Sequence, residues 1–398
     1  MSSIPVEFIL FGAALVGVAF LHHRTLTVAL VGLATILAYK FAFTGFGEAA
    51  GAEGLALHLA HHWVELANLA LLLLGFAVLS RHFEQSQLPD LAPDVLPDDW
   101  LGGLALLALV FVGSAFLDNI AGALIGATVA AHVYRKKVHI GFLAAIVAAS
   151  NAGGAGSVVG DTTTTMMWIA GKSPLAVLHA YVGAIVAFFV LAIPAALMQQ
   201  RHAPILKHDI GGVVVDWGRV GVVVFLLAGV VAVNIGANLF APELLQTLPL
   251  IGLSLWAAIL TSAPLRAPDW RVLPESAKGT TFLLALVMAA SLMPVEQLPT
   301  PSWQSALGMG FISAVFDNIP LTALALQQGD YDWGVLAYAV GFGGSMMWFG
   351  SSAGVAVANL FPEAKSAFGW LRAAWFVPIA YVLGFVALMV FPGWHPQP

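Results

Sequence analysis

Apolar runs long enough to cross a membrane recur along the whole of this 398-residue chain, and they constrain its fold more than any other feature. About 20 such residues span the hydrocarbon core of a bilayer as an α-helix, whereas membrane-spanning strands would show a weaker, alternating pattern. The composition agrees, because 60% of the residues are hydrophobic, only 9% are charged and the mean hydropathy is +0.91. The sequence therefore predicts an all-α polytopic membrane protein without a soluble domain.

Two acidic strings lie at matching points of the two halves of the chain. The first is Ser114-Ala-Phe-Leu-Asp118-Asn119, and the second is Ser313-Ala-Val-Phe-Asp317-Asn318. An aspartate at the centre of a bilayer costs about 2.5 to 3.5 kcal/mol. A chain that places this cost twice is expected to use both carboxylates for its function.

The spacing of the apolar runs predicts a tandem duplication. The first repeat, 1–200, is expected to contain spans near 4–21, 25–43, 55–80 and 173–198, a polar segment from Gln85 to Asp99, a re-entrant hairpin 101–134 and a broken helix 138–171. After a cytoplasmic linker, 201–217, the second repeat, 218–398, is expected to contain spans near 218–240, 249–264, 279–294 and 373–391, a hairpin 303–327 and a broken helix 333–359. Each repeat would thus carry about five spanning helices, counting its broken helix, and one hairpin. The span 4–21 lacks the basic start and small-residue cleavage site of a removable signal.

Glycine and proline mark the expected backbone breaks. These breaks are predicted at Gly153, Gly154, Gly160, Pro320, Gly343 and Gly344. Aligning the two double glycines sets Gly160-Asp161-Thr162 against Gly350-Ser351-Ser352. Irregular backbone at this depth is found where it lines a cavity enclosed by protein, as at the binding sites of transporters.

Charge placement predicts that the two repeats insert in opposite directions. With each hairpin counted as two half-passes, all 15 Lys and Arg residues except Lys40 and Lys172 fall on one side. The positive-inside rule makes that side the cytoplasm. Both termini are therefore expected in the periplasm of a bacterial inner membrane.

Carboxylate, amide and hydroxyl oxygens gather at the expected breaks and predict a site for a hard cation such as Na⁺ or Li⁺. The candidate binding residues are Asp118, Asn119, Asn151, Asp161, Thr162, Thr163, Asp317, Asn318, Ser351 and Ser352. Within this set, Asp161 and Asp317 are expected to hold the metal ion and to exchange it for a proton. The alternative is that each Asp only caps a broken helix, and that Thr162 and Thr163 only bond their own helix.

A polar stripe follows one face of the third span. It consists of His58, His61, His62, Glu65 and Asn68. Glu65 is a further candidate for proton coupling, or it pairs with a histidine one turn away. The histidines near a membrane interface have no assigned role, and the pattern lacks the second histidine of a zinc protease motif. Because the chain has no Cys, disulfides and thiolate metal sites are excluded.

The motifs resemble those of the NhaD-type sodium/proton antiporters, which belong to the ion transporter superfamily of citrate, arsenite and dicarboxylate carriers. The resemblance rests on Ser-Asn-Ala-Gly-Gly-x-x-Ser-x-x-Gly-Asp-x-Thr-Thr-Thr-Met (Ser150 to Met166), Ser-Ala-x-x-Asp-Asn-x-Pro-Leu (Ser313 to Leu321), Gly343-Gly344-Ser345 and Gly350-Ser351-Ser352-Ala353-Gly354. It implies two inverted repeats with two hairpins, often a homodimer, in which a substrate-binding unit moves against a scaffold. One departure is Ile120-Ala-Gly-Ala-Leu, which stands where family members usually carry hydroxyl side chains.

The favoured function is therefore a secondary active transporter that exports Na⁺ or Li⁺ in exchange for H⁺ by alternating access, not an enzyme. Its partners would be inorganic cations, protons and the lipid bilayer, with no cofactor and no nucleic acid. A cation-coupled citrate or dicarboxylate carrier is the first alternative. An intramembrane aspartyl protease is a remote one, because Asp161 follows Val158-Val159-Gly160 and not the Gly-x-Gly of such enzymes.

Overall fold

The chain folds almost entirely into α-helices. The structure is a computed structural model, and it describes residues 5–21, 24–46, 49–88, 96–158, 160–170, 172–205, 214–294, 300–316 and 318–397. Among these residues, five helices are long and apolar enough to cross a membrane, or six if a bent pair counts as one span, and several shorter apolar helices accompany them. The expected class, an all-α polytopic membrane protein, is confirmed.

Most helices follow one another closely along the chain. In the first half they are α1 (Val6–Phe20), α2 (Thr25–Tyr39), the π-helix η2 (Lys40–Thr44), α3 (Gly51–Gln85), α5 (Trp100–Ser114), α6 (Asn119–Val133), α7 (Ile140–Gly154), α8 (Thr162–Ile169), α9 (Pro174–Leu178) and α10 (Ala180–His202). In the second half they are α11 (Trp217–Phe240), α12 (Pro242–Thr247), α13 (Leu250–Ser262), η4 (Trp270–Val272), α14 (Leu273–Ser291), α15 (Trp303–Ser313), α16 (Asn318–Gln328), α17 (Trp333–Gly343), η6 (Gly344–Met346), α18 (Ser352–Leu360), η7 (Pro362–Lys365), α19 (Ala367–Ala373) and α20 (Phe376–Val390). The longest intervals lie between α3 and α5 and between α10 and α11.

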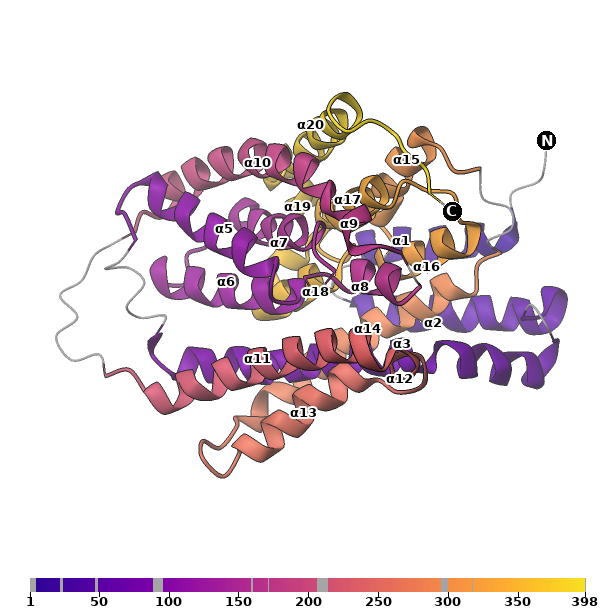
Figure 1. The fold of residues 1–398 in the computed structure, drawn as a ribbon, viewed down its shortest axis with the longest axis horizontal. Helices are drawn as coiled ribbons and strands as arrows, with labels where there is room; N and C mark the ends of the chain where they lie inside the picture. Colours follow the sequence, from indigo (N-terminus) through magenta and orange to yellow (C-terminus); the bar gives the residue numbers. More distant parts are fainter. Residues whose placement is uncertain are drawn as a thin grey trace.

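Packing divides these helices into two groups. The core group consists of α5–α10 and α15–α20 and includes the short helices that follow the helix interruptions. The outer group consists of α1–α3 and α11–α14 and packs along one side of the core group. Figure 1 shows α3, α11 and α13 running along the lower side, with α5, α6, α7 and α10 above them. Each group takes helices from both halves of the chain. The space between the two groups is where the candidate site lies.

The most deeply buried helices are α7 and α17. Every residue of α17 is buried, as is every residue of α7 from Gly141 to Gly154. In the outer group, by contrast, large apolar side chains such as Val31, Val224 and Leu260 are more than two-fifths exposed. An apolar surface of this kind is suited to lipid.

The interruptions of the two halves have matching close contacts. A Cβ added to Gly153 of α7 would overlap the backbone oxygen of Phe111 in α5. A Cβ added to Gly343 of α17 would likewise overlap the backbone oxygen of Gly310 in α15. Only glycine permits such an approach. Glycine is therefore required at these positions for each helix to pack against the backbone of its neighbour.

Two elements differ from the expected spans. The third helix, α3, runs from Gly51 to Gln85 and is longer than the predicted 55–80. The predicted last span, 373–391, begins slightly too early, because α20 starts at Phe376 after a 61° bend that separates it from α19. Pro378 explains this break: it has no N–H to donate to the carbonyl of Ala374, whereas in the first turn of a new helix that donor is not needed.

Candidate functional site

Two of the expected acidic residues directly precede helices of the core group. Asp118 precedes α6, and its Oδ1 accepts a hydrogen bond from the backbone N of Ile120 at 2.9 Å. Asp161 precedes α8, and its Oδ1 accepts from the backbone N and the Oγ1 of Thr163, both at 2.8 Å. Both carboxylates are therefore helix caps. Because capping uses Oδ1, the Oδ2 of each carboxylate is left for other contacts.

Asn119 joins the hairpin of α5 and α6 to the break between α7 and α8. Its Nδ2 donates to Oδ2 of Asp161 and to Oδ1 of Asn151, both at 3.1 Å. All three side chains are almost completely buried, with Asp161 only 1% exposed. Thr162 lies beside this group and donates its Oγ1 to Oδ2 of Asp118 at the long distance of 3.4 Å. The structure thus brings together Asp118, Asn119, Asn151, Asp161, Thr162 and Thr163.

The same network reaches the second half of the chain through Asn151. Its Nδ2 donates to Oγ of Ser345 at 2.9 Å and to Oγ of Ser351 at 3.1 Å. Ser351 also caps α18, accepting from the backbone N of Gly354 at 3.2 Å, and Ser352 is the buried first residue of that helix. Ser351 therefore stands at α18 as Asp161 stands at α8.

A glycine of the second half leaves room beside Asp161. A Cβ added to Gly341 of α17 would lie 3.5 Å from Oδ2 of Asp161. The carboxylate is therefore placed where the two halves of the chain meet.

The remaining expected residues of the second hairpin are only partly described. Asp317 lies outside the described residues. Its expected role in binding Na⁺ or Li⁺ therefore stays a prediction. The side chain of Pro320 is also outside the described part. Asn318 is buried at the start of α16, where its backbone oxygen accepts from Oγ1 of Thr322 at 3.0 Å.

A cavity of about 680 Å³ separates the two groups of helices at this site. Asp118 and Thr162 line it, together with residues of α3, α11, α12, α13 and α16. Asn119, Asn151 and Asp161 are not part of the lining. An ion in the cavity would therefore meet Asp118 before it met Asp161.

The polar stripe of α3 forms one wall of this cavity. His58, His61, His62, Glu65 and Asn68 all line it. Nδ1 of His62 lies 3.3 Å from Oε2 of Glu65, which agrees with the expected pairing of Glu65 with a histidine about one turn away. Nε2 of His58 bonds Oγ of Ser291 in α14 at 2.9 Å.

Some polar residues near the site were not expected from the sequence. Ser345 follows the second double glycine and accepts a hydrogen bond from Asn151. Asn234 of α11 and Gln246 of α12 line the cavity. Asn234 is one of two asparagines in the sequence of the apolar helix α11, and that pattern does not show which face the helix presents to a cavity.

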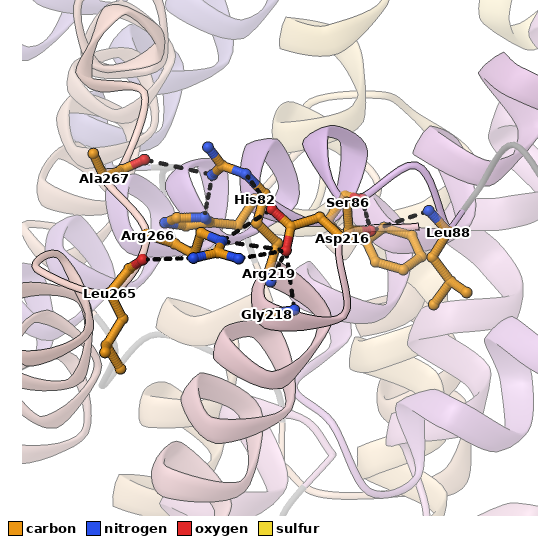
Figure 2. Close-up of polar contacts among 10 residues, drawn as sticks. His82, Ser86, Leu88, Asp216, Gly218, Arg219, Leu265, Arg266 and Ala267 are labelled. Carbon is orange, nitrogen blue, oxygen red and sulfur yellow. Dashed lines mark hydrogen bonds and ion pairs between the residues drawn. The ribbon is translucent and has the colours of Figure 1, made fainter. Parts of the chain in front are cut away.

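A separate charged network lies at the other end of α3 and ties it to α11 and to the segment after α13 (Figure 2). Nε of Arg266 donates to Oδ2 of Asp216 at 2.9 Å, and Nη1 of Arg219 donates to Nδ1 of His82 at 3.0 Å. The backbone N of Asp216 also donates to the carbonyl of Ser86 at 2.9 Å. The hydrogen bonds from Arg266 hold the pKa of Asp216 below its ordinary value. This network fixes the outer group at the end remote from the cavity.

No protein-family model matches the chain. Individual relatives do match over most of its length. It is 26% identical to sodium/proton antiporter 1 of Arabidopsis thaliana, over 97% of this chain and 72% of that protein. It is also 26% identical to the Na⁺/H⁺ antiporter NhaD of Vibrio parahaemolyticus, over 79% of this chain and 87% of that protein. A second NhaD, from Halomonas elongata, is 28% identical over 62% of this chain and 57% of its own length. These relatives are named as transporters and not as enzymes, and they confirm the resemblance of this chain to the NhaD-type sodium/proton antiporters.

Proposed function

We propose that this protein is a secondary active transporter that exchanges Na⁺ for H⁺. The observation that carries the proposal is Asp161, a fully buried carboxylate whose hydrogen-bond partners among the described residues, Asn119 and Thr163, are neutral. A buried negative charge without a positive partner is costly, and the cost is removed when the carboxylate binds either a cation or a proton. Because one group serves both, the two ligands compete, and competition produces exchange rather than co-transport.

The neighbouring residues have distinct parts in this proposal. Asn119 and Asn151 orient the carboxylate and supply neutral amide oxygens, as Asn318 would from the second hairpin. Asp118 and Thr162 receive the ion from the cavity, which they line. Asp317 would be the second exchanging carboxylate, as the repeated Asp-Asn string suggests, and Ser351 and Ser352 would complete the site from α18. Glu65 remains a candidate for carrying protons along the cavity wall.

The remaining expectations belong to the same proposal. The two halves, 1–200 and 218–398, would insert in opposite directions, with the segment 201–217 in the cytoplasm and both termini in the periplasm of a bacterial inner membrane. Li⁺ would replace Na⁺, because both are hard cations suited to oxygen ligands. A homodimer is expected from the resemblance alone.

The test is proton flux in vesicles that contain the purified protein. Adding NaCl to acid-loaded vesicles should release protons from the wild type, and Asp161→Asn should abolish the release because an amide cannot exchange a proton for an ion. Asp330→Asn is the matched control: Asp330 is exposed, and its positive φ of 55° is a conformation that asparagine tolerates. Undiminished Na⁺-dependent release from Asp161→Asn would disprove the proposed role.

The alternatives are not favoured. Among the described residues that line the cavity there is no Lys or Arg, whereas the carboxylates of Asp118 and Glu65 are present. Such a wall repels a citrate or dicarboxylate anion. The relatives named as sodium/proton antiporters also speak against a protease. Citrate added in place of NaCl should therefore produce no flux.

A further inference from the structure

The cavity beside Asp118 is much larger than a sodium ion requires. Its volume of about 680 Å³ lies in the middle of the range of roughly 300 to 1,000 Å³ that is typical of sites for small organic molecules. Such sites have mostly apolar walls and a few convergent polar groups. The size of the cavity therefore allows a ligand larger than the transported ion.

The walls and the charges together select the chemical class of this ligand. Leu69 and Leu72 of α3, Val230 of α11 and Ile251 of α13 give one side of the cavity an apolar surface. Two carboxylates, Glu65 on α3 and Asp118 before α6, also line it. Among the described lining residues no Lys or Arg offsets them. Charge complementarity thus favours a cation, and the apolar surface favours one that carries a hydrophobic body.

One carboxylate is available from each side of the cavity. Oε2 of Glu65 lies 3.3 Å from Nδ1 of His62, which leaves Oε1 for a ligand. Oδ1 of Asp118 caps α6, and the contact from Oγ1 of Thr162 to Oδ2 is long, at 3.4 Å. Hydrogen bonds from an ammonium group to a carboxylate are about twice as strong as neutral ones.

We propose that this cavity is a binding site for amphipathic organic cations of the aromatic ammonium class. The ammonium group binds the carboxylates of Glu65 and Asp118, and the aromatic ring packs against Leu69, Leu72 and Val230. The ligand bridges α3 of the outer group and the start of α6 in the core group, and it occupies the space through which Na⁺ would reach Asp118. This inference goes beyond the proposed exchange of inorganic ions, because it assigns a second kind of ligand to the protein.

The test is equilibrium binding of 1-naphthylmethylammonium to the purified full-length protein in detergent at pH 8.5, measured by calorimetry. The neutral analogue 1-naphthalenemethanol has the same ring system and serves as the ligand control. We expect the ammonium compound to bind at least tenfold more tightly than the alcohol. Glu65→Gln and Asp118→Asn should each weaken the ammonium compound about tenfold and leave the alcohol unchanged.

Glu53→Gln is the matched protein control, because Glu53 lies on the same helix as Glu65 but is exposed and outside the cavity lining. It should bind both compounds as the wild type does. Replacing KCl by NaCl at constant ionic strength should weaken the ammonium compound, since both cations approach Asp118. Unchanged alcohol binding and a normal elution volume would show that the variants are folded.

The inference is overturned if the alcohol binds as tightly as the ammonium compound, or if both charge-removing variants keep wild-type affinity. These outcomes are separate from those for ion exchange, because binding is measured without a gradient. Ligand binding without Na⁺-dependent proton release would refute only the proposed function. Proton release without ligand binding would refute only the present inference.

Discussion

The hydrogen bond between Asn151 and Ser351 joins the two halves of the chain, and its loss should be measurable in a double-mutant cycle. Nδ2 of Asn151 donates to Oγ of Ser351 at 3.1 Å, and the two residues are 200 positions apart in the sequence. Asn151→Ala, Ser351→Ala and the double variant separate this bond from the other interactions of each residue. The cycle therefore tests the contact between the halves directly.

The magnitudes follow from the contacts of each side chain. Asn151 makes three neutral side-chain hydrogen bonds, to Asn119, Ser345 and Ser351. At about 0.5 to 1.5 kcal/mol each, Asn151→Ala should cost roughly 1.5 to 4.5 kcal/mol. Ser351→Ala removes one of these bonds and the cap of α18, so it should cost about 1 to 3 kcal/mol. The double variant should be more stable than the sum of the single losses predicts by about 0.5 to 1.5 kcal/mol, because the shared bond is lost only once.

The readout is the apparent melting temperature in one detergent at one scan rate, because unfolding of a large membrane protein is usually irreversible, and the shifts of the three variants from the wild type are compared in place of free energies. Asn359→Ala is the control, because Asn359 is a half-buried amide on α18 away from this network. It should change the apparent melting temperature much less than Asn151→Ala does. Strictly additive losses in the cycle would refute the inferred contact between Asn151 and Ser351.

Two further predictions concern the backbone and the charged network. Gly153→Ala should destabilise the protein by about 1 to 3 kcal/mol in thermal unfolding, because its Cβ would overlap the carbonyl oxygen of Phe111. Gly221→Ala, on α11 with no atom within 4 Å of its Cβ, should be neutral or slightly stabilising, and equal losses would contradict the packing argument. Asp216→Asn should slightly lower the melting temperature at pH 7. Because Arg266 holds the pKa of Asp216 below the ordinary value of about 3.9, the ionised pair stabilises the fold above that pH, and the stability is lost as the pH falls through the folded-state pKa. The difference between wild type and Asp216→Asn should therefore shrink in acid, and a difference that grows towards low pH would contradict this sign.

Several parts of the site could be predicted from the sequence because they depend on local chemistry. Asp118 and Asp161 stand before short helices in which their carboxylates accept backbone N–H groups, and such caps need only neighbouring residues. The double glycines were expected near the interruptions and stand at the ends of α7 and α17, but their close contacts with α5 and α15 are tertiary. By contrast, the short helix α19 and its 61° bend to α20 were not predicted, because the expected last span, 373–391, begins only where α19 ends.

Contacts between distant segments could not be predicted in this way. Nothing in the local sequence shows that Asn151 would reach Ser345 and Ser351, or that the stripe with Glu65 on α3 would share a cavity with Asp118. These depend on which face each helix turns towards its neighbours, and an apolar helix in a membrane has apolar residues on both its lipid face and its packed face.

The sequence by itself therefore determined the membrane class, the helical content, the approximate places of the helix interruptions and the residue types found there. The first two follow from the lengths of the apolar segments, and the last two follow from the hydrogen-bonding needs of the nearby backbone. Only the tertiary structure decided which breaks meet, which carboxylate is buried behind the cavity and which one lines it. The physical reason is that burial and hydrogen bonding at Asp161 arise from helices far apart in the chain, whose relative positions are set by side-chain packing.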